Sequence, residues 1–317
     1  MEKLLEIDDL RVRFTTEFSK ADALNGLNLV IHKQESLGLV GETGAGKTTV
    51  ALSILNILSK NGEVLSGDVR FKGKSCFQMS TRELLDMRGN RISMVFQNPM
   101  TSLNPVFTIG EQISMVLRHH KRMSNKDADE YTKKLLKSVN IPEFRLHDYP
   151  QQFSGGMRQR VGIAAAIACN PELLIADEPT TALDVTIQAQ ILELLKELQR
   201  NYSTSLLMIT HNLGIISALC EKVAVMYAGR IIEYGSVKEV FSRPKHPYTI
   251  GLLGALPNLE GKRDRLNAIP GRIANAKDLP DGCRFHPRCS HCEERCRTES
   301  PVMKESDGNH CAECFLC

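Results

Sequence analysis

The sequence contains no tryptophan, and only 5% of its 317 residues are aromatic. It also lacks long hydrophobic runs, since no apolar stretch approaches the roughly 20 residues that a membrane-spanning helix needs. The opening residues, MEKLLEIDDL, have neither the basic region nor the long apolar core of a signal peptide. These absences predict a soluble protein of the cytoplasm.

Neither sign of charge is in clear excess. The chain carries 40 lysine and arginine residues against 37 aspartate and glutamate residues, for a formal net charge of +3. This balance gives no support for a nucleic-acid partner, although a local site for a phosphate ligand is compatible with it. The length allows one large domain with additions, or two modest domains.

Short apolar runs without alternation occur at several points in the chain. Residues 36–40, 173–176 and 206–209 are such runs, which are typical of parallel strands buried on both faces. Residues 48–58 and 187–198 instead carry apolar side chains at helical spacing. Strands and helices that alternate in this way predict an α/β layered core.

Two regions depart from this alternation. Residues 108–149 have a helical pattern without a convincing strand, which predicts an inserted helical subdomain. Residues 223–226 and 231–234 flank an Ala-Gly-Arg turn and predict a hairpin, after which proline and glycine become frequent. The predicted domains are a 1–235 domain, with its core over 1–96 and 156–235 and the helical subdomain over about 97–155, and an extension over 236–317.

A glycine-rich loop joins the first predicted strand to the first predicted helix. Its sequence matches the P-loop pattern G-x-x-x-x-G-K-[ST]. Backbone N–H groups of such a loop face phosphates, Lys47 can reach the β and γ groups, and the Thr48 hydroxyl can bind Mg²⁺. An ordinary glycine turn is the alternative, but the bare pattern should occur by chance in only roughly one such chain per hundred. The matching residues are Gly41, Glu42, Thr43, Gly44, Ala45, Gly46, Lys47 and Thr48.

Three polar residues follow the other two predicted strands. Asp177 would hold Mg²⁺ through its water shell, which leaves Glu178 to orient and deprotonate an attacking water. His211 follows the next strand, and ligands of open α/β sheets gather at the carboxyl ends of strands. Taken alone, the two acids would be hydrated charges at a strand end and His211 a packed or capping residue, so this interpretation depends on the glycine-rich loop.

A further motif is Phe153-Ser154-Gly155-Gly156-Met157-Arg158-Gln159-Arg160. It resembles the signature segment of ABC ATPases, which separates these enzymes from other P-loop proteins. Its glycines and the Ser154 hydroxyl can bind an anion at a helix start, and a serine-capped helix is the simpler alternative. Over about residues 4–235 the resemblance implies a P-loop NTPase of the ABC type, with a RecA-like core and a mixed sheet.

In this family the signature segment faces the γ-phosphate of ATP held by the opposite subunit, so that two head-to-tail domains enclose two ATP molecules. The resemblance implies that Gln97 senses Mg²⁺ and the attacking water, that Asp184 lies at the dimer interface, and that His211 contacts the γ-phosphate. The predicted site for ATP and Mg²⁺ comprises Gly41, Glu42, Thr43, Gly44, Ala45, Gly46, Lys47, Thr48, Thr49, Gln97, Ser154, Gly155, Gly156, Asp177 and Asp184, with Glu178, His211 and Gln97 as catalytic residues and Thr48 and Gln97 as magnesium ligands.

Two positions depart from the family pattern. Met157 stands where many members have glutamine, a change that we expect to matter little. Ala21 falls where many have the aromatic residue that stacks on adenine, so Phe14 or Phe18 takes that role or none does. The preference for ATP over GTP is therefore implied only by the resemblance.

A narrower resemblance rests on three segments, and it extends through the C-terminal region. It is to the ATPases of dipeptide and oligopeptide importers, which implies two membrane permease subunits, a second homologous ATPase and, indirectly, a solute-binding protein as partners. It also implies a peripheral location on the cytoplasmic face of the membrane. The segments are Gln97-Asn98-Pro99-Met100-Thr101-Ser102-Leu103-Asn104-Pro105, Ala176 to Thr186, and Pro244-Lys245-His246-Pro247-Tyr248-Thr249.

Three other functions remain open at this point. Close relatives of the peptide importers carry nickel or other small solutes. Soluble ABC proteins with iron-sulfur or zinc modules act on ribosomes or DNA, but they usually have two ATPase cores, a long coiled coil or a strongly basic face. A cysteine-based redox sensor with a vestigial nucleotide domain would not need Lys47, Asp177, Glu178 and His211, all of which are present.

Seven of the ten cysteines lie between Cys283 and Cys317, whereas the others are scattered and predicted to be small packing residues. The importer resemblance implies a ligand set of Cys283, Cys289, Cys296 and Cys314. Four thiolates suit a [4Fe-4S] cluster, with a structural zinc ion as the alternative. The simplest alternative to a metal site is a thiol-rich, poorly ordered tail. Further possible ligands are Cys292, Cys311, Cys317, His286, His291 and His310.

Overall fold

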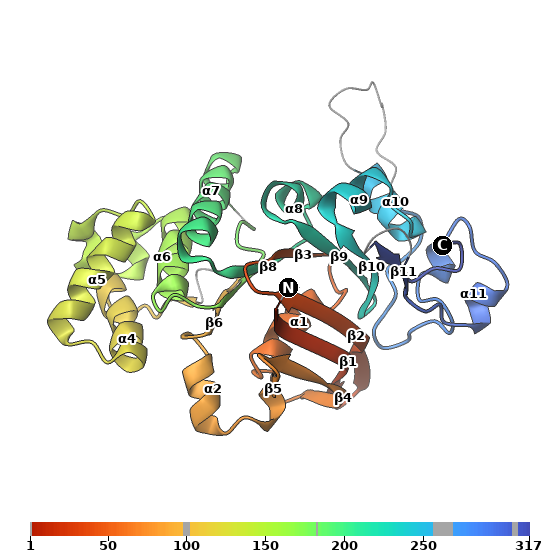
Figure 1. Cartoon of the computed structure of the whole chain (residues 1–317), viewed down its shortest axis with the longest axis horizontal. Helices are drawn as coiled ribbons and strands as arrows, with labels where there is room; N and C mark the ends of the chain where they lie inside the picture. Colours follow the sequence, from red (N-terminus) through yellow and green to blue (C-terminus); the bar gives the residue numbers. More distant parts are fainter. Residues whose placement is uncertain (1, 98–101, 182, 256–268, 306–309) are drawn as a thin grey trace. The chain divides into compact units, whose positions relative to one another are not determined.

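The computed structural model describes residues 2–97, 102–181, 183–255, 269–305 and 310–317 (Figure 1). The chain forms two compact units, each made of segments that are separate in the sequence. Among the described residues, the first unit consists of Glu2, His32–Ser36 and those within Gln78–Ile209, and the second of Lys3–Ile31, Leu37–Phe77 and those within Thr210–Cys317.

Three parallel strands form the sheet of the first unit. Strand β6 (Ile92–Val95) pairs with β7 (Leu173–Asp177), which pairs with β8 (Ser205–Thr210). Every residue of β7 and β8 is buried, so both faces of these strands are covered, as the continuous apolar runs predicted. Helix α7 (Val185–Tyr202) connects the two strands, and it buries Ile191, Leu194, Leu195 and Leu198.

Helices make up most of the rest of the first unit. They are α2 (Thr81–Met87), α4 (Ile109–Lys121), α5 (Asn125–Ser138) and α6 (Gly155–Ile167), with short 3-10 turns η2 (Glu143–His147) and η3 (Pro150–Gln152). A capping box starts α4, because Thr108 Oγ1 accepts from Glu111 N at 3.2 Å while the Glu111 carboxylate accepts from Thr108 N at 2.9 Å. The described residues from 102 to 155 contain α4, α5, η2, η3 and the first residue of α6, and no strand, which confirms the helical pattern predicted there.

An antiparallel sheet in the second unit was not predicted. Its strand order is β2 (Ser19–His32), β1 (Lys3–Thr16), β4 (Gly62–Phe71) and β5 (Lys74–Ser75), with η1 (Cys76–Gln78) following. The pairing of β1 with β4 shifts register between Asp8 and Val12. Such a shift breaks the alternation of buried and exposed side chains by which a strand is recognised in a sequence.

The other strands of the second unit continue the predicted pattern. Strand β3 (Ser36–Val40) runs parallel to β9 (Lys222–Tyr227), and β10 (Arg230–Ser236) returns antiparallel to β9, which confirms the predicted hairpin. Helix α8 (Leu213–Leu219) precedes β9, and α1 (Lys47–Ile54) follows β3. The prediction of a helix to residue 58 was wrong, because Asn56 adopts a left-handed conformation with φ of 51° and ends the helix.

The C-terminal residues add to this unit. Strand β12 (Cys311–Ala312) pairs with β10, and β11 (Lys304–Glu305) pairs with β12. Three aromatic rings join the extension to β9, since Tyr227 lies 4.7 Å from Tyr248 and 5.3 Å from Phe285 between ring centroids. Its helices are α9 (Val237–Ser242), α10 (Pro247–Gly254), the 3-10 turn η4 (His286–Arg288) and α11 (Arg295–Thr298).

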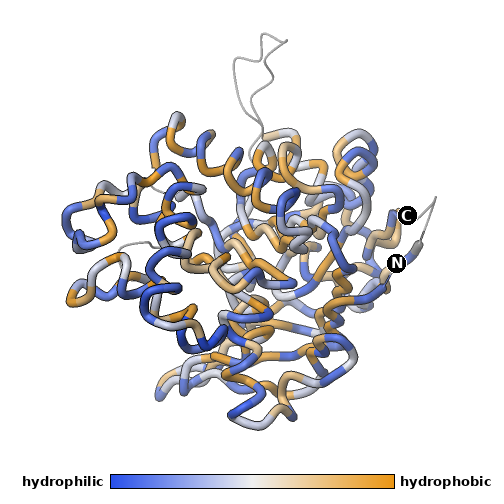
Figure 2. The backbone as a smooth tube through the Cα atoms, turned by 60° about the vertical axis from the view of Figure 1, so that its left-hand side comes forward, coloured by the Kyte–Doolittle hydropathy of each residue, from blue (hydrophilic) through white to orange (hydrophobic). Residues whose placement is uncertain are grey.

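Hydrophilic and hydrophobic residues alternate along many of the helices (Figure 2). This is the amphipathic pattern of helices that pack one side against a core. Among the described residues, no helix combines the length and the apolar composition that crossing a membrane requires.

Candidate nucleotide site

The glycine-rich loop connects β3 to α1 in the second unit. Lys47 is 6% exposed, and its ammonium donates to Gly41 O at 2.7 Å and to Glu42 O at 3.1 Å. Gly46 has a φ of 102°, and a Cβ there would lie 2.6 Å from Ala23 O. Only glycine fits this close turn, which curls the backbone around the lysine ammonium.

The loop fits a phosphate ligand. Thr43, Gly44 and Thr48 are exposed, so the mouth of the loop is accessible. The loop leads into the first turn of α1, where unpaired N–H groups favour anions. Thr48 places a hydroxyl at the same helix start, where it can bind a magnesium ion that accompanies the phosphates.

In the first unit, β7 delivers the two predicted acids. Asp177 ends the strand and is 2% exposed. Glu178 Oε2 accepts from Gln97 Nε2 at 3.0 Å and from Thr181 Oγ1 at 2.9 Å. The structure thus brings Gln97 and Glu178 together, although they are 81 residues apart in the sequence. Both donors orient a carboxylate that can accept a proton from water.

Two further predicted residues cap helices in the first unit. Ser154 Oγ accepts from Met157 N at 3.4 Å and so caps the start of α6. Asp184 Oδ1 accepts from Ile187 N at 2.9 Å at the start of α7. A Cβ on Gly156 would lie 2.5 Å from the Ile187 side chain, so the starts of α6 and α7 are close together. Both capping side chains are exposed, as a role at a subunit interface requires.

The remaining predicted residues take the following places. His211 is exposed directly after β8 and belongs to the second unit. Phe18 is 94% exposed at the β1–β2 turn, whereas Phe14 is half-buried. Residues 98–101 of the importer-like segment and Ala182 of the Ala182-Leu183-Asp184 segment lie outside the described residues. The site residues therefore divide between the two compact units, and the complete site stays a prediction.

The four predicted cysteine ligands line one cavity in the second unit, together with His246, His286 and His291. Burial, with a smaller effect of the neighbouring cysteines 296, 314 and 289, raises the pKa of the Cys283 thiol to about 11. Burial also raises the pKa of Cys289. Within the described residues, no group of three or more His, Cys, Asp or Glu side chains is arranged to hold a metal ion. Cys292, Cys311 and Cys317 do not line this cavity.

Sequence reasoning missed two residues that bind the phosphate loop. Tyr248 Oη accepts from Glu42 N at 3.0 Å, and the Arg288 guanidinium donates to both Glu42 carboxylate oxygens. Hydrogen bonding to Glu42 is the largest cause that raises the pKa of Arg288, and burial raises the pKa of Tyr248. No local pattern could reveal these contacts, because the partners lie 206 and 246 residues apart.

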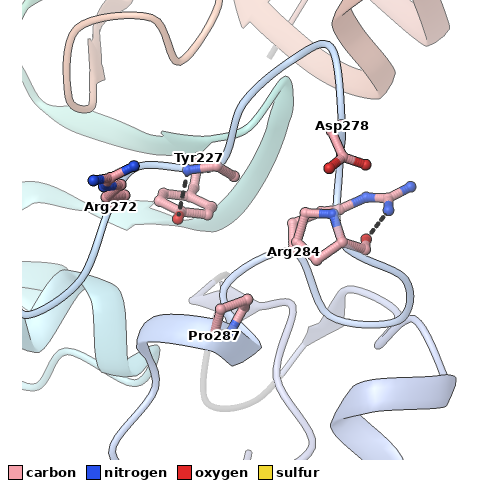
Figure 3. A pocket seen from close by; sticks show the side chains of 7 residues that line it. Tyr227, Arg272, Asp278, Arg284 and Pro287 are labelled. Atoms are coloured by element: carbon pink, nitrogen blue, oxygen red, sulfur yellow. Dashed lines mark hydrogen bonds between the residues drawn. The ribbon is translucent and has the colours of Figure 1, made fainter.

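A separate cavity of about 240 Å³ lies beside the same aromatic cluster (Figure 3). Tyr227 Oη accepts from Ala274 N at 3.3 Å, and Arg284 donates to Pro280 O. Figure 3 shows Arg272 and Asp278 on opposite sides of Tyr227. This cavity contains none of the residues that were predicted to bind nucleotide.

Two protein families match this chain. The family described as ABC transporter matches residues 24–181, and the oligopeptide/dipeptide transporter C-terminal region matches residues 232–296. The oligopeptide transport ATP-binding protein OppD of Salmonella typhimurium is 49% identical over 307 residues, which are 96% of this chain and 91% of the relative. AppD of Bacillus subtilis, with the same description, is 45% identical and covers 100% of this chain and 97% of its own.

Solved structures show the same fold. The dimeric ATP-binding cassette MJ0796 bound to ADP and Pi has a TM-score of 0.67 and 26% identity, covering 74% of this chain and 98% of its own. The cbiO1 protein from Clostridium perfringens, part of the ABC transporter complex cbiONQ, has a TM-score of 0.66 and 27% identity, covering 80% of this chain and 96% of its own.

Fold and phosphate loop together define an ATP-binding cassette, which confirms the predicted fold class and the predicted ATPase activity. More closely, the chain belongs to the ATP-binding subunits of the oligopeptide and dipeptide ABC transporters, as the match of both of its regions shows.

Proposed function

We propose that ATP hydrolysis by this chain powers the import of dipeptides or oligopeptides through membrane permease subunits, from the cytoplasmic face of the membrane. The observation that carries the proposal is the match over essentially the whole chain, ATPase and C-terminal regions alike, to relatives described as oligopeptide transport ATP-binding proteins. The partners are two permease subunits, a second homologous ATPase in a head-to-tail dimer and, indirectly, a solute-binding protein.

The residues have separate roles in this proposal. The loop from Gly41 to Thr49 binds the phosphates of ATP, with Lys47 neutralising charge on the β and γ groups. Thr48 and Gln97, with Asp177 acting through water, would hold the magnesium ion, which would supply positive charge against the charge that develops during phosphoryl transfer.

Glu178 orients the attacking water and accepts its proton, and Gln97 keeps its carboxylate in place. His211 contacts the γ-phosphate. Ser154, Gly155 and Gly156 bind the nucleotide of the neighbouring ATPase, and Asp184 lies across that interface. The proposed domain division stays as predicted, with the helical subdomain over about 97–155 and the extension over 236–317.

Transport in vesicles that contain the assembled transporter tests the cargo. We expect ATP-dependent uptake of a labelled peptide, and loss of that uptake in a Lys47→Ala variant. Uptake of nickel ions in the absence of peptide uptake would contradict the proposal and favour the nickel importers instead. A chain that purifies with ribosomes or DNA, and without permease subunits, would contradict it in another way.

We further propose that Cys283, Cys289, Cys296 and Cys314 hold a [4Fe-4S] cluster, with zinc as the alternative. These four are the cysteines of the tail that share a cavity. Four thiolates would supply the ligands that a [4Fe-4S] cluster requires, and the same number would suit a structural zinc ion. Iron and sulfide analysis of anaerobically purified chain tests this. Stoichiometric zinc without iron would disprove it.

A further inference from the structure

Three polar groups of Glu42, the second residue of the phosphate loop, are bound at once. Its N–H donates to Tyr248 Oη at 3.0 Å, and its carbonyl oxygen accepts from Lys47 Nζ at 3.1 Å. Its carboxylate oxygens accept from Arg288 at 2.6 and 3.1 Å. Glu42 therefore connects two residues of the C-terminal extension to the lysine that meets the phosphates.

Arg288 is held rigidly in its place. Its side chain is 3% exposed, and its Nε donates to Pro270 O at 3.0 Å. The guanidinium carbon also lies 5.8 Å from the ring centroid of Tyr227 and 5.9 Å from that of Phe285. A planar guanidinium that donates from Nε and from both terminal nitrogens is held in one orientation.

Tyr248 is equally constrained. It is fully buried, and its ring centroid lies 4.7 Å from that of Tyr227 and 5.4 Å from that of Phe285. Its hydroxyl reaches the loop backbone from this cluster. The position of the Glu42 N–H thus depends on packing inside the extension rather than on the loop alone.

A purely stabilising ion pair does not account for this arrangement. Buried ion pairs add little net stability, because desolvation offsets their attraction. The extension has another arginine-glutamate pair, Arg295 with Glu293 at 2.7 Å, on its surface with side chains 47% and 43% exposed. The pair with Glu42 differs in that its acceptor belongs to the loop between Gly41 and Lys47.

We propose that Arg288 and Tyr248 are positioning residues for ATP binding, which hold Glu42 so that the loop keeps its phosphate-binding conformation. The inference rests on the proposed role of this loop. A loop that is ordered in advance loses less entropy when the phosphates bind. The extension is then part of the nucleotide site, and its loss weakens ATP binding before it slows turnover.

Substitution of each residue in the full chain tests this. In Arg288→Met and Tyr248→Phe we expect the dissociation constant of a fluorescent ATP analogue to rise about tenfold, the scale of a lost hydrogen bond to a charged or buried group. In the assembled transporter the KM for ATP should rise similarly, while kcat at saturating ATP changes less than about twofold. Arg288→Lys, which keeps the charge, should recover part of the affinity.

Arg295→Met is the matched control, because it breaks an arginine-glutamate pair of the extension that does not involve the loop. A double variant, Glu42→Gln with Arg288→Met, should bind ATP no more weakly than the worse single variant, because the two side chains act as a pair. Tyr248→Phe keeps the buried ring, so it remains informative if Arg288→Met fails to fold, as thermal unfolding would show.

Lys47→Ala separates failure of this inference from failure of the proposed site. If Lys47→Ala abolishes nucleotide binding while Arg288→Met and Tyr248→Phe bind as tightly as Arg295→Met, the positioning role is wrong and the site stands. If Lys47→Ala binds ATP normally, the proposed site is wrong and the inference falls with it. A fall in kcat with unchanged KM would also overturn the inference.

Discussion

Glu178 occupies an unusual backbone position for its residue type. Its φ is 45°, in the left-handed region, and its side chain accepts from both Gln97 and Thr181 through the same oxygen. The strand before it is buried throughout. A side chain fixed from the backbone and from two donors has little freedom to turn, which suits a group that must meet one water molecule in one orientation.

Glu178→Gln should lower ATP hydrolysis by about 100-fold or more, the usual effect of losing a general base, because an amide cannot accept the proton of water. Nucleotide binding should persist, so an ATP-bound dimer should accumulate. Phosphate release by the assembled transporter and gel filtration with ATP measure the two effects. Glu197→Gln, on an exposed position of α7, is the control. Normal hydrolysis by Glu178→Gln would remove this residue from the role of base.

Cys76 bears out the predicted packing role of the scattered cysteines, since it is fully buried. Burial raises the pKa of its thiol from 9.0 to about 11. Its contribution to stability is therefore complete below pH 9.0 and is lost as the pH rises towards about 11, because only the unfolded chain then ionises.

We expect the free energy of unfolding to fall by about 1.4 kcal/mol per pH unit in that window through this group. Urea unfolding at several pH values measures it, and Cys76→Ala should lack this part of the decline. An equal pH dependence in both proteins would assign the effect to other groups.

Among the elements, the helix starts of the first unit offer a matched pair. Ser154 caps α6 and Ser124 caps α5, in each case by accepting from the N–H three residues later, at 3.4 and 3.2 Å. Replacing either serine by alanine should cost about 1 kcal/mol of stability, the usual value of an N-cap.

Only Ser154→Ala should also lower ATP hydrolysis in the assembled transporter, because Ser154 is proposed to contact the nucleotide of the neighbouring subunit. Urea unfolding and phosphate release for both variants give the comparison. Equal hydrolysis in the two variants would show that Ser154 serves its own helix alone.

The elements that could be predicted are those whose signal is local. Strands β7 and β8 are buried on both faces, and α7 repeats its apolar residues at helical spacing. The antiparallel sheet was not predicted because β1 changes register and is exposed along much of its length. The first helix was predicted to extend to residue 58 because its apolar pattern continues past Asn56, where the backbone turns left-handed.

The parts of the candidate site that could be predicted are likewise those with a local signal in the sequence. The glycine-rich loop is contiguous, so its residues could be recognised together. A catalytic role for Gln97 was expected only from the family resemblance, and its hydrogen bond to Glu178 was not predicted. The contact between Arg288 and Glu42 depends on chain folding over 246 residues, for which no local pattern exists.

At the scale of the whole molecule, the proposed cluster should stabilise the second unit, because a group that binds only the folded chain shifts folding by mass action. Cys289→Ser should lose iron and lower the unfolding temperature by several degrees, as a loss of about 1 to 2 kcal/mol would do. Cys292→Ser is the control, since Cys292 does not line the cavity. Thermal unfolding and iron content under anaerobic conditions measure both. Equal iron content in the two variants would contradict the predicted ligand set.

The short turn η4 ends with Arg288, and Cys289 follows it directly. One segment of three residues therefore leads both to the phosphate loop and to the thiol-lined cavity. If occupancy of the cavity orders this turn and so favours ATP, thermodynamic linkage requires ATP to favour retention of the cluster by the same factor. A chelator should then extract iron less completely at equilibrium when ATP is present, and Arg288→Met should abolish that protection. Bound ATP would in this way protect the proposed cluster against loss of iron.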